Sequence, residues 1–272
     1  MAELLPTNDV LFKMIFGDKR HSRILIHFLN SVIKPIHPIK EVEIKKTELT
    51  PENISQKGVR LDILATTDNG ELVNIEMQKK DEKDMSARAL FYWSRIFAGQ
   101  LEVSEEYHNL RRTISISILD FTLFKDDERF WRKGYIKDEE TNEKFTDMLE
   151  MHFIELNKMR QVRDESPITF WIEFFKNPYS EKVQALCEFV PEIREAKEVF
   201  EKAKSDPEAQ ELIRIKEKAT RDYASGMAGA KREGREEERK KNAINMKTKG
   251  FDNKLISECL NISETEVEEL LS

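Results

Sequence analysis

The amino-acid sequence predicts a mixed α+β fold whose first elements follow the order αβββαβ, continued by C-terminal helices. Near the N-terminus, apolar residues recur every three or four positions, which is typical of amphipathic helices. An aromatic-rich helical segment runs from Asp84 to about Leu101. Apolar and polar residues alternate in four other segments, as in half-buried strands, at residues 42–44, 59–67, 71–79 and 113–119.

Local signals define the ends of these elements. Thr7-Asn8-Asp9 supplies the start of a helix that runs to about Phe16, and a second helix covers Ile24–Val32. Pro167 is placed at the first turn of a later apolar helix, where proline is tolerated. The remaining expected elements are a strand near Tyr135, a strand over Met148–Leu156 and this helix over Ser166–Lys176.

Composition excludes several classes of protein. The 272 residues are 36% charged with a net charge of −7, so a globally basic nucleic-acid binder is not indicated, although a local basic cleft is compatible. No apolar run approaches the roughly 18 residues of a membrane span, and the N-terminal residues lack a signal-peptide pattern. Two widely separated cysteines exclude a disulfide framework or a zinc motif and favour a cytoplasmic location.

The chain divides into three expected parts. Residues 1–190 form the α+β domain, and residues 191–241 form a helical connector of nearly balanced charge. Balanced charge favours a solvated helix over a nucleic-acid-binding arm, because phosphate binding needs net positive charge. Residues 242–272 form a tail of two short helices, the second of which starts with a capping box of Ser263 and Glu266.

The tail is expected to bind protein rather than DNA. Its last helix contains four glutamates and no basic residue, so it would be repelled by phosphates if it acted as a recognition helix. We therefore expect a protein-interaction module and a homo-oligomer formed through the C-terminal helices. The expected apolar seam of the tail consists of Leu255, Ile262, Val267 and Leu270.

A hairpin around Asp68-Asn69-Gly70 determines which residues lie opposite each other. A three-residue loop puts Gly70 at the position that favours the left-handed conformation. That register pairs apolar residues with apolar residues along one face, whereas a two-residue loop would pair apolar residues with polar ones. On the other face it places Asp62 opposite Glu76 and Arg60 opposite Gln78.

Two carboxylates facing each other across a hairpin destabilise it, because cross-strand partners lie only about 4.5–5.5 Å apart at Cβ. A divalent cation would reverse the sign of this interaction, since Mg²⁺ binds carboxylate oxygens and retains several waters. From the hairpin alone, a metal site and a chance pair of solvent-facing acids are equally supported.

Segments along most of the chain resemble a known group of enzymes. Gly58–Ile63 and Asn74–Gln78 resemble the PD-(D/E)XK nuclease superfamily. With Thr7–Lys13, Ser86–Trp93 and His152–Lys158, the chain is more narrowly similar to the recombination-promoting nuclease / putative transposase family. The resemblance implies a restriction-endonuclease-like core with a mixed sheet. It also implies a metal-dependent endonuclease that cuts double-stranded DNA in recombination, mobile elements or phage defence.

The resemblance also implies roles for individual residues. Asp62 and Glu76 would bind Mg²⁺, or Mn²⁺ in its place, and Asp9 would complete the acidic cluster or contact the metal through water. Gln78 occupies the position where the wider superfamily has lysine, and Lys80 could supply the missing charge if the strand continues. A neutral Gln78 is also compatible with a catalytically degraded protein that only binds DNA or regulates a partner. The expected nucleic-acid contacts are Lys13, Arg60, Arg88, Tyr92 and Arg95.

Without the resemblance, each of these residues has a simpler interpretation. Asp9 would stabilise the start of a helix through the helix dipole. The basic side chains of Lys13, Arg88 and Arg95 would be ordinary surface charges.

Overall fold

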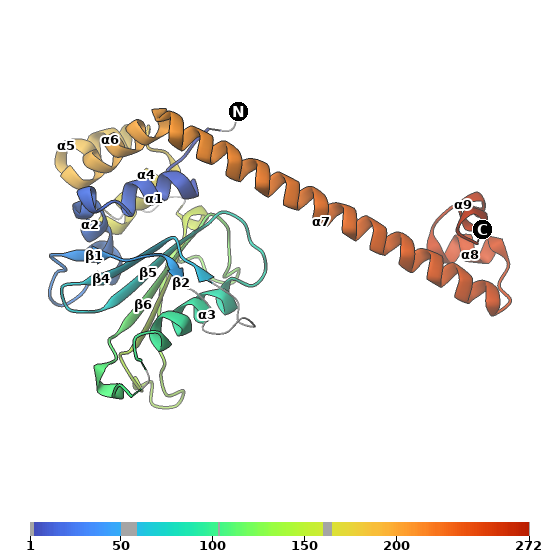
Figure 1. The fold of residues 1–272 in the computed structure, drawn as a ribbon, viewed down its shortest axis with the longest axis horizontal. Helices are drawn as coiled ribbons and strands as arrows, with labels where there is room; N and C mark the ends of the chain where they lie inside the picture. Colours follow the sequence, from blue (N-terminus) through green and yellow to red (C-terminus); the bar gives the residue numbers. More distant parts are fainter. Residues whose placement is uncertain (1–2, 50–58, 103, 160–164, 272) are drawn as a thin grey trace. The chain divides into compact units, whose positions relative to one another are not determined.

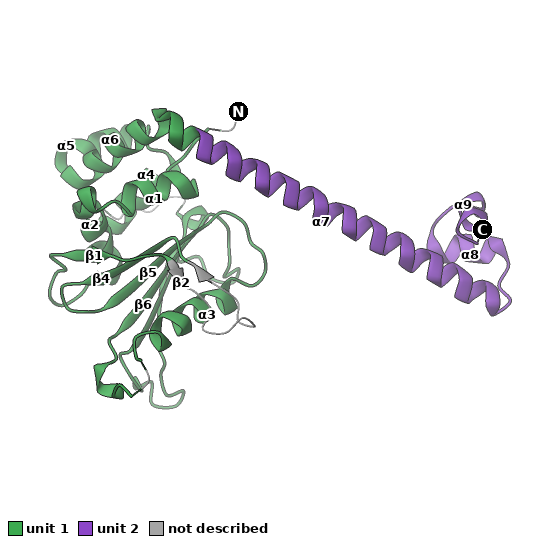
Figure 2. Cartoon of the chain, viewed as in Figure 1, with its two compact units in different colours: residues 1–210 green, residues 211–272 purple. Residues whose placement is uncertain are grey.

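The computed structural model describes residues 3–49, 59–102, 104–159 and 165–271, without the side chains of residues 48, 49, 59 and 60. The chain forms two compact units, residues 1–210 and residues 211–272 (Figure 2), and each is described by itself. Helix α6 (Pro191–Ser205) belongs to the first unit, where its Ile193, Ala196 and Phe200 are buried. The expected boundary at residue 190 therefore falls inside this unit.

A mixed six-stranded sheet forms the centre of the first unit, in the order β1-β4-β5-β6-β8-β7. Strands β5, β6 and β8 run parallel, and the outer pairs are antiparallel. The predicted α+β class is confirmed. The strands of this sheet are β1 (Val42–Ile44), β4 (Ile63–Thr67), β5 (Leu72–Gln78), β6 (Thr113–Leu119), β7 (Trp131–Gly134) and β8 (Leu149–Glu155).

Helices cover both faces of this sheet (Figure 1). Helix α3 (Met85–Ala98) lies on one face, here called the α3 face, and the remaining helices of the unit gather on the other. There an aromatic core packs around Phe16, whose ring centroid lies 5.3 Å from that of Trp171 and 5.5 Å from that of Phe28. These helices are α1 (Asp9–Phe16), α2 (Ser22–Ile33), α4 (Pro167–Lys176), α5 (Glu181–Phe189) and α6, and three short 3₁₀ turns lie at Lys19–His21, Tyr107–Asn109 and Leu156–Lys158.

The predicted helix starts are confirmed at α1 and α4. The Asn8 side chain accepts hydrogen bonds from the backbone N–H groups of Val10 and Leu11, at 3.0 and 3.4 Å. These bonds satisfy donors that have no partner inside the helix. Pro167 occupies the first turn of α4, where a missing N–H has no cost.

The hairpin register agrees with the prediction from β4 onward. Ile63 pairs with Ile75 and Ala65 with Val73, and Gly70 adopts φ 79° in the three-residue loop. The expected continuous strand over residues 59–67, however, is interrupted. Its first part is β3 (Val59–Arg60), which pairs with β2 (Glu48–Leu49) instead of with β5, so Arg60 lies opposite Glu48.

The interruption has a physical cause at Asp62. The backbone N–H of Met77 is bound by the Asp62 carboxylate, at 2.9 Å, rather than by a backbone carbonyl of a partner strand. The side chain of Asp62 thus substitutes for ladder pairing at this point. The β4–β5 ladder begins at Ile63 and Ile75, so the predicted ladder pairs of Asp62 with Glu76, of Leu61 with Met77 and of Arg60 with Gln78 were wrong. Asp62 and Glu76 are nevertheless in contact through the Asp62 N–H.

The second unit contains most of helix α7 (Pro207–Thr248), followed by α8 (Asn253–Leu260) and α9 (Glu264–Leu271). The predicted capping box is present: the Ser263 backbone N–H donates to Glu266 at 2.8 Å, and the Glu266 N–H donates to the Ser263 hydroxyl at 3.2 Å.

Most of the apolar residues that were expected to bind protein are instead buried in the core of the tail itself. Val267 is fully buried against Ala243 and Ile256, and Ile262 and Leu270 pack on this cluster. Leu255 is 42% exposed. Three of the four expected seam residues are therefore committed to the core of the tail. Among the described residues, no helix is both long enough and apolar enough to cross a membrane.

Replacing Gly70 with alanine should lower the free energy of unfolding of the first unit by about 1–2 kcal/mol, because an L side chain is strained at positive φ. A Cβ at this position would meet nothing closer than Arg111 at 3.8 Å, so the cost is conformational rather than steric. Urea unfolding, monitored by tryptophan fluorescence, measures this change in the free energy of unfolding, since all three tryptophans lie in this unit. Gly70→Asn is the control and should lose less; equal loss in both variants would contradict the argument.

Candidate active site

Two acidic side chains come together where β4 begins beside β5. The backbone N–H of Asp62 donates to Oε1 of Glu76 at 3.2 Å, and the backbone N–H of Met77 donates to Oδ2 of Asp62 at 2.9 Å. Glu76 therefore accepts a hydrogen bond from the backbone of Asp62, and Asp62 accepts one from the residue that follows Glu76. Glu76 is buried with 2% exposure, and the Asp62 side chain is 15% exposed.

Lys13 reaches this acid pair from helix α1. Its Nζ lies 3.1 Å from Oδ1 of Asp62 and donates to the backbone carbonyl of Leu61 at 3.3 Å. The sequence predicted a phosphate contact for Lys13, and in the structure its ammonium is a partner of Asp62. The two oxygens of Asp62 thus have different partners, a backbone N–H on Oδ2 and an ammonium on Oδ1.

Burial and the neighbouring negative charge of Asp62 raise the pKa of Glu76 to about 8. The hydrogen bond from the Asp62 backbone and the positive charges of Arg88 and Lys13 oppose this increase without cancelling it. A carboxyl group in this environment retains its proton near neutral pH unless a further positive charge approaches. Such perturbed groups are concentrated at functional sites.

Helix α3 places basic and aromatic side chains above the same face of the sheet. Arg88 donates from Nε to the Tyr92 hydroxyl at 3.0 Å, and its guanidinium lies 5.2 Å from the centre of the Tyr92 ring. Tyr92 packs against the cluster of Leu61, Leu64 and Ile96. Arg88 is thereby held near Glu76, whose pKa it lowers. Arg95 follows Tyr92 by three residues and is partly buried.

Gln78 and Lys80 have different positions relative to the strand. Gln78 is the last residue of β5, pairs with Leu119 of β6 and is partly buried. Lys80 lies two residues beyond the end of β5 and is exposed. The condition under which Lys80 was expected to supply the missing charge, continuation of the strand, is therefore not met.

Another predicted residue, Asp9, is not assembled with the pair. In the part of the chain that the structure describes, no three His, Cys, Asp or Glu residues are grouped closely enough to hold a metal ion. Asp9, the first residue of α1, therefore does not complete an acidic cluster with Asp62 and Glu76. The side chain of Arg60 lies outside the described residues.

The acid pair nevertheless fits a divalent cation of the Mg²⁺ type. Such ions are commonly bound through one or two carboxylates, with waters and substrate phosphates as the other ligands. The burial of Glu76 and the negative charge of Asp62 raise the pKa of Glu76. A bound cation would offset the repulsion between the two carboxylates. These two residues are the ones that would hold it.

A second buried polar cluster, around Glu150 of β8, was not predicted. The fully buried Glu150 carboxylate lies 3.0 Å from Lys133 Nζ and 2.6 Å from His152 Nε2, and also forms an ion pair with Arg112. Burial alone would raise its pKa, but the bond from His152, with Lys133 and Arg112, lowers the pKa to about 2. Glu150 is in register with Ile114, on the face opposite Glu76, so the cluster is separate from the acid pair.

The signal for this cluster in the sequence was weak. Glu150 and His152 are two residues apart, which puts them on the same side of a strand, but their cationic partners come from distant segments. Trp131 Nε1 donates to His152 Nδ1 at 3.1 Å, which leaves the His152 proton on Nε2, facing Glu150.

The segment His152–Lys158, noted for its resemblance, holds a neighbouring loop. Glu155 accepts hydrogen bonds from the backbone N–H groups of Leu123 and Phe124, at 2.7 and 3.1 Å. Lys158 lies 2.8 Å from Oε2 of Glu155 and also donates to the backbone carbonyls of Phe124 and Asp127. These contacts hold the loop after β6 at the carboxyl ends of β6 and β8.

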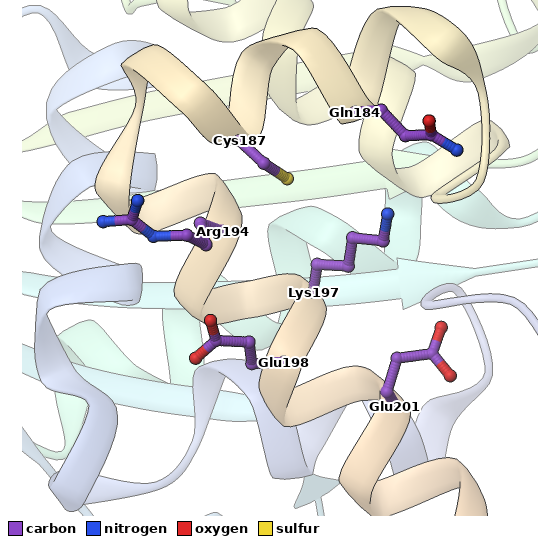
Figure 3. Close-up of a pocket in the computed structure, with 6 residues that line it drawn as sticks. All are labelled: Gln184, Cys187, Arg194, Lys197, Glu198 and Glu201. Atoms are coloured by element: carbon purple, nitrogen blue, oxygen red, sulfur yellow. The ribbon is translucent and has the colours of Figure 1, made fainter.

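A pocket of about 490 Å³ lies between α5 and α6, away from the predicted site residues (Figure 3). Burial raises the pKa of the Cys187 thiol in its wall, so this cysteine is not an activated nucleophile. The lining residues are Gln184, Cys187, Arg194, Lys197, Glu198 and Glu201.

The match to a family model agrees with this geometry. Residues 6–230 match the model of the PD-(D/E)XK nuclease family transposase, and the chain belongs to this family. The predicted resemblance is confirmed, and the family indicates a nuclease. A search of the curated proteins and a search of the solved structures gave no match.

The raised pKa of Glu76 predicts how stability depends on pH. Without metal, the folded chain retains a proton on Glu76 between the ordinary pKa of 4.5 and about 8, whereas the unfolded chain releases it. The contribution of Glu76 to stability therefore falls as pH rises through this range. Glu76→Gln removes that loss, so it should be more stable than the wild type by roughly 2–5 kcal/mol at pH 8.5 and nearly equal at pH 4.5.

Urea unfolding in the presence of a chelator, followed by tryptophan fluorescence at several pH values, measures this difference. Glu139→Gln, at an exposed loop position, is the matched control and should show no pH-dependent gain. A Glu76→Gln difference that stays constant from pH 4.5 to 8.5 would contradict the assignment.

Proposed function

We propose that this chain is an endonuclease that uses a divalent cation to cut double-stranded DNA, with Mg²⁺ as the metal and Mn²⁺ as its substitute. The proposal depends on one observation, the side-by-side placement of the Asp62 and Glu76 carboxylates by reciprocal backbone hydrogen bonds. The family match supports the same activity class.

The side chains around the pair have distinct roles in this proposal. Asp62 and Glu76 hold the cation, which, when bound, polarises a phosphoryl oxygen of the DNA and lowers the pKa of water. Tyr92 orients Arg88, which contacts a phosphate oxygen next to the site. Gln78, at the end of β5, donates a neutral hydrogen bond to the reacting phosphate or to water. Arg95 and Arg60 are proposed to contact the DNA backbone farther away.

A second candidate function is supported by the lack of a positively charged side chain at the end of β5. Gln78 is neutral and Lys80 lies beyond β5, so the strand itself supplies no cation to the site. A catalytically degraded protein that binds DNA or regulates a partner would have this feature. Calorimetry separates the two, since a cation that binds only when Asp62 and Glu76 are intact favours the enzyme.

The C-terminal helices are proposed to join copies of the chain, in the cytoplasm. Leu212, Ile215, Tyr223 and Met227 of α7 recur at helical spacing and are between 52% and 72% exposed. Exposed apolar side chains in such a row are typical of a surface that contacts protein. Among possible cellular roles, recombination, mobile elements and phage defence are all compatible with this activity.

Asp62→Asn should abolish nicking of supercoiled plasmid DNA in Mg²⁺, with a loss of at least about 100-fold, because the amide lacks the charge that holds a cation. The amide oxygen can still accept the Met77 N–H, so the hairpin should stay folded. Gel electrophoresis of nicked and linear plasmid measures the rate. Asp126→Asn, at an exposed loop position, is the control, and cleavage by Asp62→Asn at the wild-type rate would exclude the proposed site.

Deleting residues 242–272 should lower the number of chains per particle in solution, because the deletion removes the exposed apolar side chains of Ile244, Phe251 and Leu255 from the proposed interface. Multi-angle light scattering of the full chain and of the truncated chain measures the mass directly. An unchanged number of chains per particle with weakened DNA binding would indicate instead that the tail contacts nucleic acid.

A further inference from the structure

The positive charge at the acid pair has to come from outside strand β5. Gln78 is neutral, and the exposed Lys80 lies beyond the strand. Phosphoryl transfer develops negative charge on the phosphate oxygens, and fixed cations stabilise that charge. The question is therefore which cation of this chain is near Asp62 and Glu76.

Several lysines and arginines of the first unit are committed elsewhere. Lys158 is bound to Glu155 and to two backbone carbonyls of the loop after β6. Lys133 and Arg112 are ion-paired with Glu150, on the opposite face of the sheet. Arg88 acts on Glu76 through its charge, but it is held by the Tyr92 hydroxyl, and its Nη1 lies 3.9 Å from the Glu82 carboxylate.

Lys13 is in direct contact with the pair. Its Nζ lies 3.1 Å from Oδ1 of Asp62, the oxygen that does not accept the Met77 N–H. A second bond at 3.3 Å, to the Leu61 carbonyl, fixes the ammonium at the start of β4. The side chain is 28% exposed, so solvent and a substrate can reach it. Lys13 thus binds one of the two carboxylates that would hold a metal ion.

An ammonium and a divalent cation at the same carboxylate oxygen repel each other. This repulsion is stronger in a partly buried site than in water, because the effective dielectric constant is lower there. If Asp62 held a cation, its carboxylate would bind the Lys13 ammonium less strongly. The four-carbon stem is flexible, so the ammonium can turn to a phosphate oxygen close by without movement of α1.

We propose that Lys13, beside Arg88, supplies positive charge to the active site from helix α1: its ammonium is the counter-ion of Asp62 without metal and a phosphate contact when metal and DNA are bound. This inference rests on the proposed nuclease function. It assigns to helix α1 the charge that neither Gln78 nor Lys80 provides. Lys13 therefore weakens metal binding in the absence of DNA, and it accelerates cleavage once DNA is bound.

Two measurements on the full chain test this assignment. Calorimetric titration with Mn²⁺ in the absence of DNA gives the metal affinity, and plasmid nicking in Mg²⁺ gives the rate. Lys13→Met keeps the apolar stem and removes the charge. It should bind Mn²⁺ about three- to tenfold more tightly than the wild type, because the competing ammonium is gone, and cut DNA about 100-fold more slowly.

Three further variants sharpen the result. Lys13→Arg keeps the charge and should retain more activity than Lys13→Met. Adding Gln78→Lys to Lys13→Met places an ammonium at the site from strand β5. The double variant should cut DNA at least about tenfold faster than Lys13→Met alone. Lys19→Met, at an exposed position, is the matched control and should change neither affinity nor rate.

The outcomes separate this inference from the proposed function. If the wild type nicks plasmid and Lys13→Met does so equally fast, the inference is overturned while the function stands. Mn²⁺ affinity that falls together with the rate in Lys13→Met also overturns it, because Lys13 would then only hold Asp62 in place. If the wild type does not nick DNA, the proposed function fails, and the Mn²⁺ titration alone decides whether Lys13 is the counter-ion of Asp62.

Discussion

The exchange of backbone hydrogen bonds between Asp62 and the Glu76–Met77 segment is the constraint on which the candidate site depends. Two carboxylates repel each other, so their own chemistry does not hold them together. Here the Asp62 N–H binds Glu76 and the Met77 N–H binds Asp62, which connects both acids to the backbone. A rigid scaffold of this kind is what a preorganised site requires.

The two faces of the sheet carry buried acids whose pKa values are shifted in opposite directions. On the α3 face, the neighbouring positive charges do not fully offset the burial of Glu76 and the charge of Asp62, so the pKa of Glu76 is raised. On the opposite face, Glu150 is surrounded by cations and a histidine, and its pKa is lowered. Burial is common to both groups, so the difference comes from the neighbouring charges. A bound cation would therefore compensate Glu76, whereas the charge of Glu150 is already balanced by its neighbours.

The sequence predicted those features that depend on local patterns. The hairpin register followed from side-chain alternation and from Gly70, and the helix starts followed from Asn8, Pro167 and the Ser263–Glu266 box. The break at Asp62 could not be predicted, because it depends on a carboxylate that replaces a ladder partner. The contact of Lys13 with Asp62 joins residues 49 positions apart in the chain, and the Glu150 cluster joins β7, β8 and Arg112, which precedes β6. No periodicity signals such contacts.

The buried Glu150 cluster limits how this protein can vary. Its carboxylate is fully enclosed, and its compensation is divided among Arg112, Lys133 and His152, from three different segments. Loss of a single partner leaves charge in the interior, which is far more destabilising than replacement of the whole set by apolar residues. Relatives of this chain should therefore have either all four polar residues or none of them. Intermediate combinations would be selected against as poorly folded proteins, whether or not they can cut DNA.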